Sequence, residues 1–77
     1  MKELLEYILQ NSVTEPDKLS IEEIEESQTT TLFRVQLSEN DKGLVIGTGG
    51  QNIKAIKTIV NIVAKRAGKK AFIKIED

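Results

Sequence analysis

The chain has 77 residues, of which 39% are hydrophobic and 30% charged, enough for one small hydrophobic core but not for two domains. It contains no cysteine and no histidine, which removes disulfides, the usual zinc ligands, thiol nucleophiles and the commonest general base. We therefore expect that the protein is not an enzyme and that it has no metal site and no cofactor. No apolar run reaches the roughly 18 residues of a membrane span, and the start shows no signal-peptide pattern, which favours a soluble cytoplasmic protein.

Charge is divided unequally along the chain, although the formal net charge is only -1. Residues 1–40 hold nine acidic and three basic residues, a balance of -6. Residues 41–77 hold eight basic and three acidic residues, a balance of +5. A basic half of this kind is typical of a surface that binds a polyanion.

The first half of the chain predicts one helix and two strands. Apolar residues at helical spacing predict an amphipathic helix over residues 2–11, which the turn around Pro16 should end. Ile24 falls out of phase with Leu19 and Ile21, so we expect a strand over residues 19–26 with a bulge near Glu22 and Glu23. Alternating apolar residues predict a half-buried strand over residues 31–37.

The second half predicts two helices and a final strand. Ser38, with Asp41 three residues later, resembles an N-cap and would start a short helix that ends at Ile46. The next helix, residues 50–67, should end at Gly68 and precede a strand over residues 71–75. Its expected apolar stripe contains Ile53, Ile56, Ile59, Val60, Val63, Ala64 and Ala67. The order helix, strand, strand, helix, helix, strand predicts a single α+β domain over residues 1–77.

A glycine-rich segment, Gly47-Thr48-Gly49-Gly50, lies between the two predicted helices. A dinucleotide-binding fingerprint would need a strand before the segment and a third glycine at Asn52. A P-loop would need Gly-Lys-Ser/Thr in place of Gly50-Gln51-Asn52. The remaining interpretations are a Gly-x-x-Gly loop that holds a nucleic-acid backbone and a tight turn with a purely structural role.

The segment from Val45 to Ile53 resembles the Val/Ile-Ile-Gly-x-x-Gly-x-x-Ile core of KH domains. The element order resembles the type II (prokaryotic) KH arrangement, a three-stranded sheet packed on helices. Over its whole length the chain is similar to small bacterial single-KH-domain proteins of the KhpA (YlqC) type. The resemblance implies binding of single-stranded RNA with low sequence specificity, and a role as a post-transcriptional regulator or RNA chaperone.

The resemblance also implies which residues would bind RNA and which partners to expect. The loop residues Gly47, Thr48, Gly49 and Gly50 would hold the RNA backbone, and Ile46 and Ile53 would form an apolar floor beneath the bases. RNA would be the main partner, and the resemblance adds a larger KH-containing bacterial protein in a heterodimer. A homodimer is expected on a separate ground, because so small a core leaves apolar surface for a second copy to cover. Because the loop itself carries no charge, a KH-fold protein-interaction module with weak or lost RNA binding is the alternative.

The helix after the loop carries a basic face without acidic residues. Helical projection places Lys54, Lys57, Thr58, Asn61 and Lys65 in one arc. We expect Lys54 to neutralise a phosphate held at the loop, Gln51 to donate a neutral hydrogen bond beside it, and Lys57 to contribute. The candidate interface residues are Ile62 and Ala55, at the edge of the apolar stripe between the core and the lysine face, and Phe72, on the outward side of the last strand.

Overall fold

The structure is a computed structural model that describes residues 1–76. Its elements in chain order are α1 (Lys2–Gln10), a 3₁₀ turn (Pro16–Lys18), β1 (Ser20–Glu25), β2 (Thr30–Gln36), α2 (Glu39–Ile46), a second 3₁₀ turn (Thr48–Gly50), α3 (Gln51–Arg66) and β3 (Lys70–Ile75). The predicted α+β class and element order are confirmed, and each observed bound lies within one residue of the predicted one.

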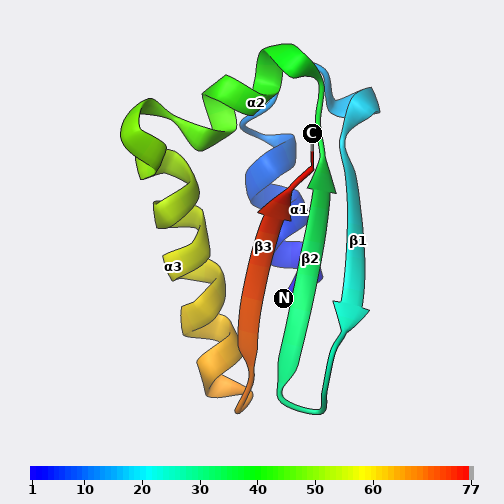
Figure 1. Ribbon diagram of the computed structural model, residues 1–77, viewed down its shortest axis with the longest axis vertical. Helices are drawn as coiled ribbons and strands as arrows, with labels where there is room; N and C mark the ends of the chain where they lie inside the picture. The colour runs from blue at the N-terminus through cyan, green and yellow to red at the C-terminus, as the bar shows by residue number, and fades with distance from the viewer. Residues whose placement is uncertain (77) are drawn as a thin grey trace.

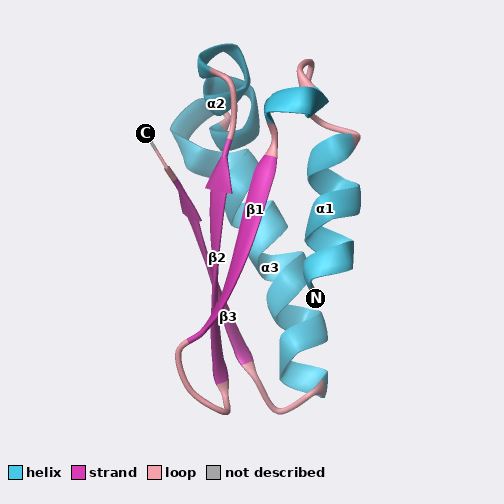
Figure 2. Cartoon of the chain, turned by 90° about the vertical axis from the view of Figure 1, so that its right-hand side faces the viewer, coloured by secondary structure: helices cyan, strands magenta, loops and turns pink. Residues whose placement is uncertain are grey.

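The three strands form a mixed sheet in the order β1-β2-β3. β1 runs antiparallel to β2, and β3 runs parallel to β2, so β1 and β3 are the two edge strands. Figures 1 and 2 show α1 and α3 on one face of the sheet, with α2 crossing at one end. The described residues leave the other face of the sheet open.

The bulge predicted near Glu22 and Glu23 is absent. The register of β1 with β2 runs without a break from Ser20↔Gln36 to Glu25↔Thr31. Ile24 is out of phase because it lies on the open face, opposite Leu32, which is in turn opposite Phe72 of β3. The sequence pattern was misread because both faces of this sheet carry apolar residues.

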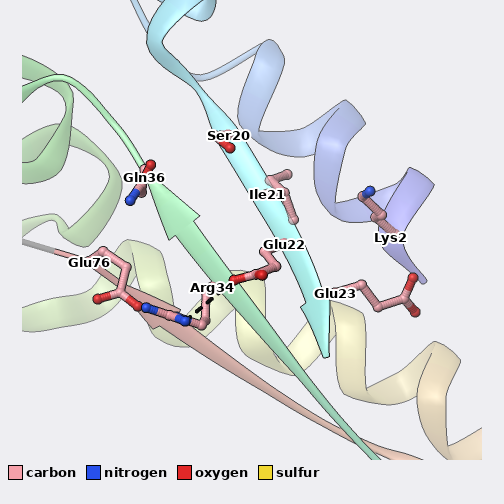
Figure 3. Close-up of a pocket in the computed structure, with 8 residues that line it drawn as sticks. All are labelled: Lys2, Ser20, Ile21, Glu22, Glu23, Arg34, Gln36 and Glu76. Atoms are coloured by element: carbon pink, nitrogen blue, oxygen red, sulfur yellow. Dashed lines mark hydrogen bonds and ion pairs between the residues drawn. The ribbon is translucent and has the colours of Figure 1, made fainter. Parts of the chain in front are cut away.

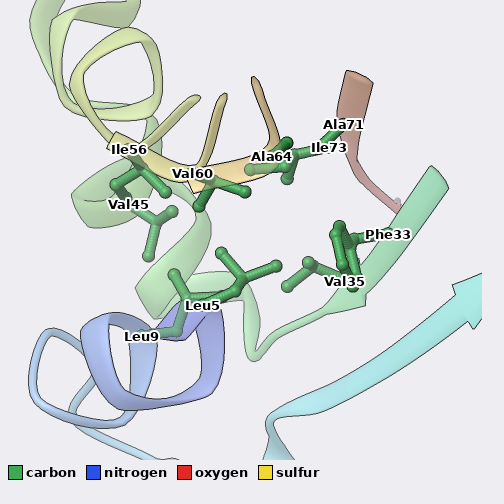
Figure 4. Close-up of a cluster of buried hydrophobic side chains, with 10 residues drawn as sticks. All are labelled: Leu5, Leu9, Phe33, Val35, Val45, Ile56, Val60, Ala64, Ala71 and Ile73. Carbon is green, nitrogen blue, oxygen red and sulfur yellow. The ribbon is translucent and has the colours of Figure 1, made fainter. Parts of the chain in front are cut away.

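The core lies between the sheet and the helices (Figure 4). Its buried residues are Leu5, Leu9, Phe33, Val35, Val45, Ile56, Val60, Ala64, Ala71 and Ile73. The predicted apolar stripe of α3 extends beyond the part of α3 that other elements cover, because α1 has only nine residues. Ile59 and Val63 are therefore 46% and 39% exposed, and Ala67 is also exposed, contrary to the sequence prediction.

The N-cap predicted at Ser38 is confirmed, and it belongs to a larger network around Asp41. The Asp41 backbone N–H donates to Ser38 Oγ over 3.2 Å, and the Ser38 hydroxyl donates to the Asp41 carboxylate over 3.0 Å. The carboxylate also accepts the backbone N–H groups of Thr14 and Glu15 and the Thr14 hydroxyl, over 2.8 to 3.0 Å. Asp41 is 1% exposed, so this network fastens the segment after α1 to the start of α2.

The end of α3 also follows the prediction. Gly68 has φ +69°, and its N–H donates to the Lys65 carbonyl over 3.0 Å. The Lys69 N–H donates to the Ala64 carbonyl over 2.8 Å. These two bonds form a Schellman motif, which turns the chain from α3 into β3.

Candidate nucleic-acid interface

The glycine loop is a stretch of nearly bare backbone at the corner where α2 meets α3 (Figure 1). Gly47, Gly49 and Gly50 have φ values of +75°, +64° and +75°, a conformation that side chains disfavour. Thr48 supplies the loop's one side chain between them, and Thr48 and Gly49 are exposed. The loop can therefore bring main-chain atoms close to a ligand backbone.

The loop leads directly into the N-terminus of α3, whose N-cap is Gly50. Within residues 1–76, no side chain accepts a hydrogen bond from this helix end at the cap position. The first N–H groups of a helix carry partial positive charge and favour an anion. This end of α3 thus suits a phosphate group.

Asn52 fixes the shape of the loop. Its side-chain Nδ2 donates to the Leu44 carbonyl of α2 over 2.8 Å, which ties α3 to the end of the preceding helix. A Cβ atom on Gly47 would lie 2.7 Å from Asn52 Cγ, closer than van der Waals contact allows. In the sequence, Asn52 served only to reject the dinucleotide fingerprint and the P-loop. Its structural role was missed because the contact depends on how two helices meet.

The lysines predicted to contact phosphate lie on the flank of α3 that borders β3. Asn61 on this flank bonds to the backbone of Ala71 in β3, which fixes its direction. Lys57 is one turn before Asn61, and Lys54 is one turn after Gly50; both are exposed. None of the ion pairs found within residues 1–76 involves a lysine of α3. Gln51 is exposed beside them at the start of the helix.

The two isoleucines predicted as an apolar floor differ in burial. Ile46, the last residue of α2, is 38% exposed, while its neighbour Val45 is buried in the core. Ile53 is half-buried and packs against the core from the first turn of α3. Both flank the glycine loop, and Ile46 has surface available for contact with a ligand.

The three candidate interface residues do not lie on one face. Ile62 is 54% exposed, and Ala55, also exposed, shares its side of α3 two turns earlier. Phe72 is on the open face of the sheet, where the Lys70 Nζ lies 5.1 Å from its ring centroid. Exposed apolar residues on α3 also include Ile59 and Val63. We call the set Ala55, Ile59, Ile62 and Val63 the α3 apolar strip.

Two of the surface hollows differ in charge. One, about 560 Å³, is lined by Lys2 and by β1, β2 and Glu76, and contains Glu22, Glu23 and Arg34. Figure 3 shows Arg34 there between Glu22 and Glu76, and the ion pairs with these two carboxylates neutralise the Arg34 charge. The other hollow, about 390 Å³, lies along the basic flank of α3 and includes Lys57 and Lys65. Only the second has the charge to attract a polyanion.

Two consecutive helices joined by a Gly-x-x-Gly loop, packed on a three-stranded mixed sheet with a preceding helix, define a KH domain of the type II arrangement. The family described as "KhpA/KhpB, KH domain" matches residues 2–75, and the chain belongs to this family.

Relatives cover nearly the whole chain. It is 35% identical to the RNA-binding protein KhpA of Chlamydia trachomatis, over 97% of this chain and 95% of the relative. The RNA-binding protein KhpA of Clostridium perfringens is also 35% identical, over 97% and 99%. That of Thermotoga maritima is 36% identical over 79% and 80%. No solved structure matches the chain. Within residues 1–76, every helix is too short or too polar to cross a bilayer.

Proposed function

We propose that this protein binds single-stranded RNA, with the glycine loop against the sugar-phosphate backbone and the basic flank of α3 beside it. The observation that carries the proposal is the exposed, left-handed backbone of the loop at a helix N-terminus without a side-chain cap, followed one turn later by Lys54. The relatives named RNA-binding protein support it. Its role would be that of a cytoplasmic post-transcriptional regulator or RNA chaperone.

The chemistry of the site sets the expected strength of binding. Thr48 and Gly49 supply shape and N–H groups but no charge, so attraction depends on Lys54 and Lys57 together with the helix end. Neutralising about three phosphates gives a slope of roughly -2 for the logarithm of affinity against that of salt concentration. Contacts to phosphate carry no sequence information, so we expect low specificity and weak affinity, of about micromolar or weaker.

The test replaces both Thr48 and Gly49 with Asp, which places two negative charges where the phosphate should lie. A Cβ on Gly49 meets nothing within 4 Å, and Asp tolerates a left-handed conformation at a cost of about 1 kcal/mol, so the fold should survive. We expect affinity for a fluorescent single-stranded oligonucleotide, measured by anisotropy, to fall by at least about tenfold.

The matched control replaces the same two residues with Asn, which has the shape of Asp and the same tolerance of positive φ, but no charge. This variant should retain most of the affinity. Unchanged affinity in the Asp variant, with native circular dichroism, would overturn RNA binding by the loop and favour the alternative, a KH-fold module that binds other proteins.

A second proposal concerns the α3 apolar strip. Its members lie on one flank of α3 and are exposed, and a chain with so small a core gains stability by covering such a surface. We propose that a second copy of the chain covers it in a two-fold symmetric homodimer. A larger KH-containing bacterial protein would use the same strip in a heterodimer.

A further inference from the structure

The outer edge of β3 faces the basic flank of α3, and the Asn61 side chain occupies it at one end. The backbone N–H of Lys70 donates to the Thr29 carbonyl, and that of Glu76 donates to the Val35 carbonyl, over 2.7 and 2.8 Å. Even-numbered residues of β3 therefore bond to β2, and the N–H and C=O groups of Ala71, Ile73 and Ile75 point outward. These groups lie along the edge of β3 that is next to α3.

Asn61 takes both outward groups of Ala71. The Ala71 N–H donates to Asn61 Oδ1 over 3.0 Å, and Asn61 Nδ2 donates to the Ala71 carbonyl over 2.9 Å. Nδ2 also donates to the Lys57 carbonyl of its own helix over 2.9 Å, so the amide is bonded to both α3 and β3. A carboxamide presents a donor beside an acceptor, as the pairing edge of a nucleobase does.

The position of this bridge sets the length of α3 that lies between the glycine loop and the Asn61 amide. About 16 Å of helix axis separate Gly50 from Asn61, a span comparable to the roughly four nucleotides that a KH domain holds. Basic surface continues past the bridge, because Lys65 is one turn further along α3 and lines the same hollow as Lys57. Charge alone would therefore not end the binding site at Asn61.

We propose that Asn61 marks the end of the RNA-binding surface, a role that we call the end stop. Its carboxamide occupies the place that a base would take against Ala71, and so sets how many nucleotides the protein binds. The proposal rests on the proposed RNA function and adds the size of the ligand. Without the Asn61 amide, the backbone of Ala71 becomes available to one further nucleotide, whose phosphate lies near Lys65.

The test measures affinity against oligonucleotide length, with single-stranded oligoadenylates from about four to about eight nucleotides. In the wild type, affinity should level off at about four nucleotides. In Asn61→Ala it should continue to rise for at least one further nucleotide, by about tenfold, the gain expected from a base that makes two hydrogen bonds. The shortest oligonucleotide should bind equally to both proteins.

The matched control is Thr58→Ala, which removes a polar group from the same flank whose hydroxyl bonds only within α3, to the Lys54 carbonyl. This variant should keep the length dependence of the wild type. Equal length dependence in Asn61→Ala and the wild type would overturn the end stop but would not contradict the proposed RNA binding. Failure of the wild type to bind any length would overturn both.

A measurement on the wild type keeps the proposal testable if Asn61→Ala does not fold. In nitrogen-proton correlation spectra recorded with a long oligoadenylate, the Ala71 backbone and Asn61 side-chain amide signals should stay in place. The signals of the glycine loop should move. Displacement of the Ala71 and Asn61 signals to the same degree as those of the loop would show that RNA displaces the bridge, and the end stop would be wrong.

Discussion

At the scale of single residues, glycine is needed at different positions of the loop for different structural reasons. Gly47 combines φ +75° with ψ 174°, a region open to almost no other residue, and it packs against Asn52. Gly49 has an ordinary left-handed conformation with open space around it. Gly47 therefore maintains the join between α2 and α3, while Gly49 leaves the loop surface free.

This difference predicts unequal effects of adding one methyl group. Gly47→Ala should lower the free energy of unfolding by about 3 kcal/mol, because it adds backbone strain and pushes Asn52 away from the Leu44 carbonyl. Gly49→Ala, the matched control, should cost only about 1 kcal/mol. Urea denaturation of both variants measures the difference. Equal losses would contradict the role assigned to the contact with Asn52.

At the scale of the elements, the sequence predicted the helices and strands well because each depends on local periodicity and capping. The Ser38 cap and the Gly68 turn are short-range patterns of this kind. The sequence failed where burial depends on which surface another element covers. Ile24 was assigned to a bulge because its partner Leu32 lies on a second strand, and Ile59 was placed in the core because the short reach of α1 was not evident.

The candidate site divides in the same way. The glycine loop and Lys54 are recognisable from local sequence, because the chemistry of backbone clamping needs those residues next to one another. Asn52 and Asn61 act through contacts to Leu44 and Ala71, on other elements. Their amides carry no distinctive pattern in the sequence, so their roles followed only from the way α3 packs.

The network that joins the segment after α1 to α2 predicts a pH dependence. The Thr14 backbone N–H is the main cause that holds the pKa of Asp41 below its ordinary value, with help from the Thr14 hydroxyl, the Glu15 N–H and Ser38, against the effect of burial. A lowered pKa in the folded state means that the charged carboxylate stabilises the fold at neutral pH. This stabilisation is lost as the pH falls through the folded-state pKa.

Asp41→Asn should therefore be less stable than the wild type by about 2 kcal/mol at neutral pH, because an amide cannot accept all four donors. The gap should narrow as the pH falls below the ordinary pKa of aspartate, about 4, and towards the lowered folded-state pKa of Asp41, at which the wild-type carboxyl becomes protonated. Urea denaturation across this range measures it. Because Arg34 lowers the pKa of Glu76 in both proteins, the titration of Glu76 cancels in the difference between them. A gap that stays constant with pH would contradict this assignment.

At the scale of the whole molecule, charge and apolar surface are segregated. The β1 edge carries Glu22, Glu23 and Glu25, which protect it against pairing with another strand. The side of the molecule that carries β3 also carries the lysines of α3. A single-stranded nucleic acid is anionic, so the β1 side would repel it and the β3 side would attract it, which orients its approach. The α3 apolar strip adjoins the basic flank, so the proposed dimer through α3 would place two basic flanks close together.

The dimer proposal predicts that only one of the two exposed apolar faces governs self-association. Ile62→Glu, on α3, would bury an unpaired charge at the interface and should weaken association by at least about 100-fold, without loss of the fold. Phe72→Glu adds the same charge to the open face of the sheet, away from α3, and should leave association unchanged. Sedimentation equilibrium measures both, with circular dichroism to verify folding. A wild type that stays monomeric at high concentration would reject the dimer, and dissociation by Phe72→Glu alone would move the interface to the sheet.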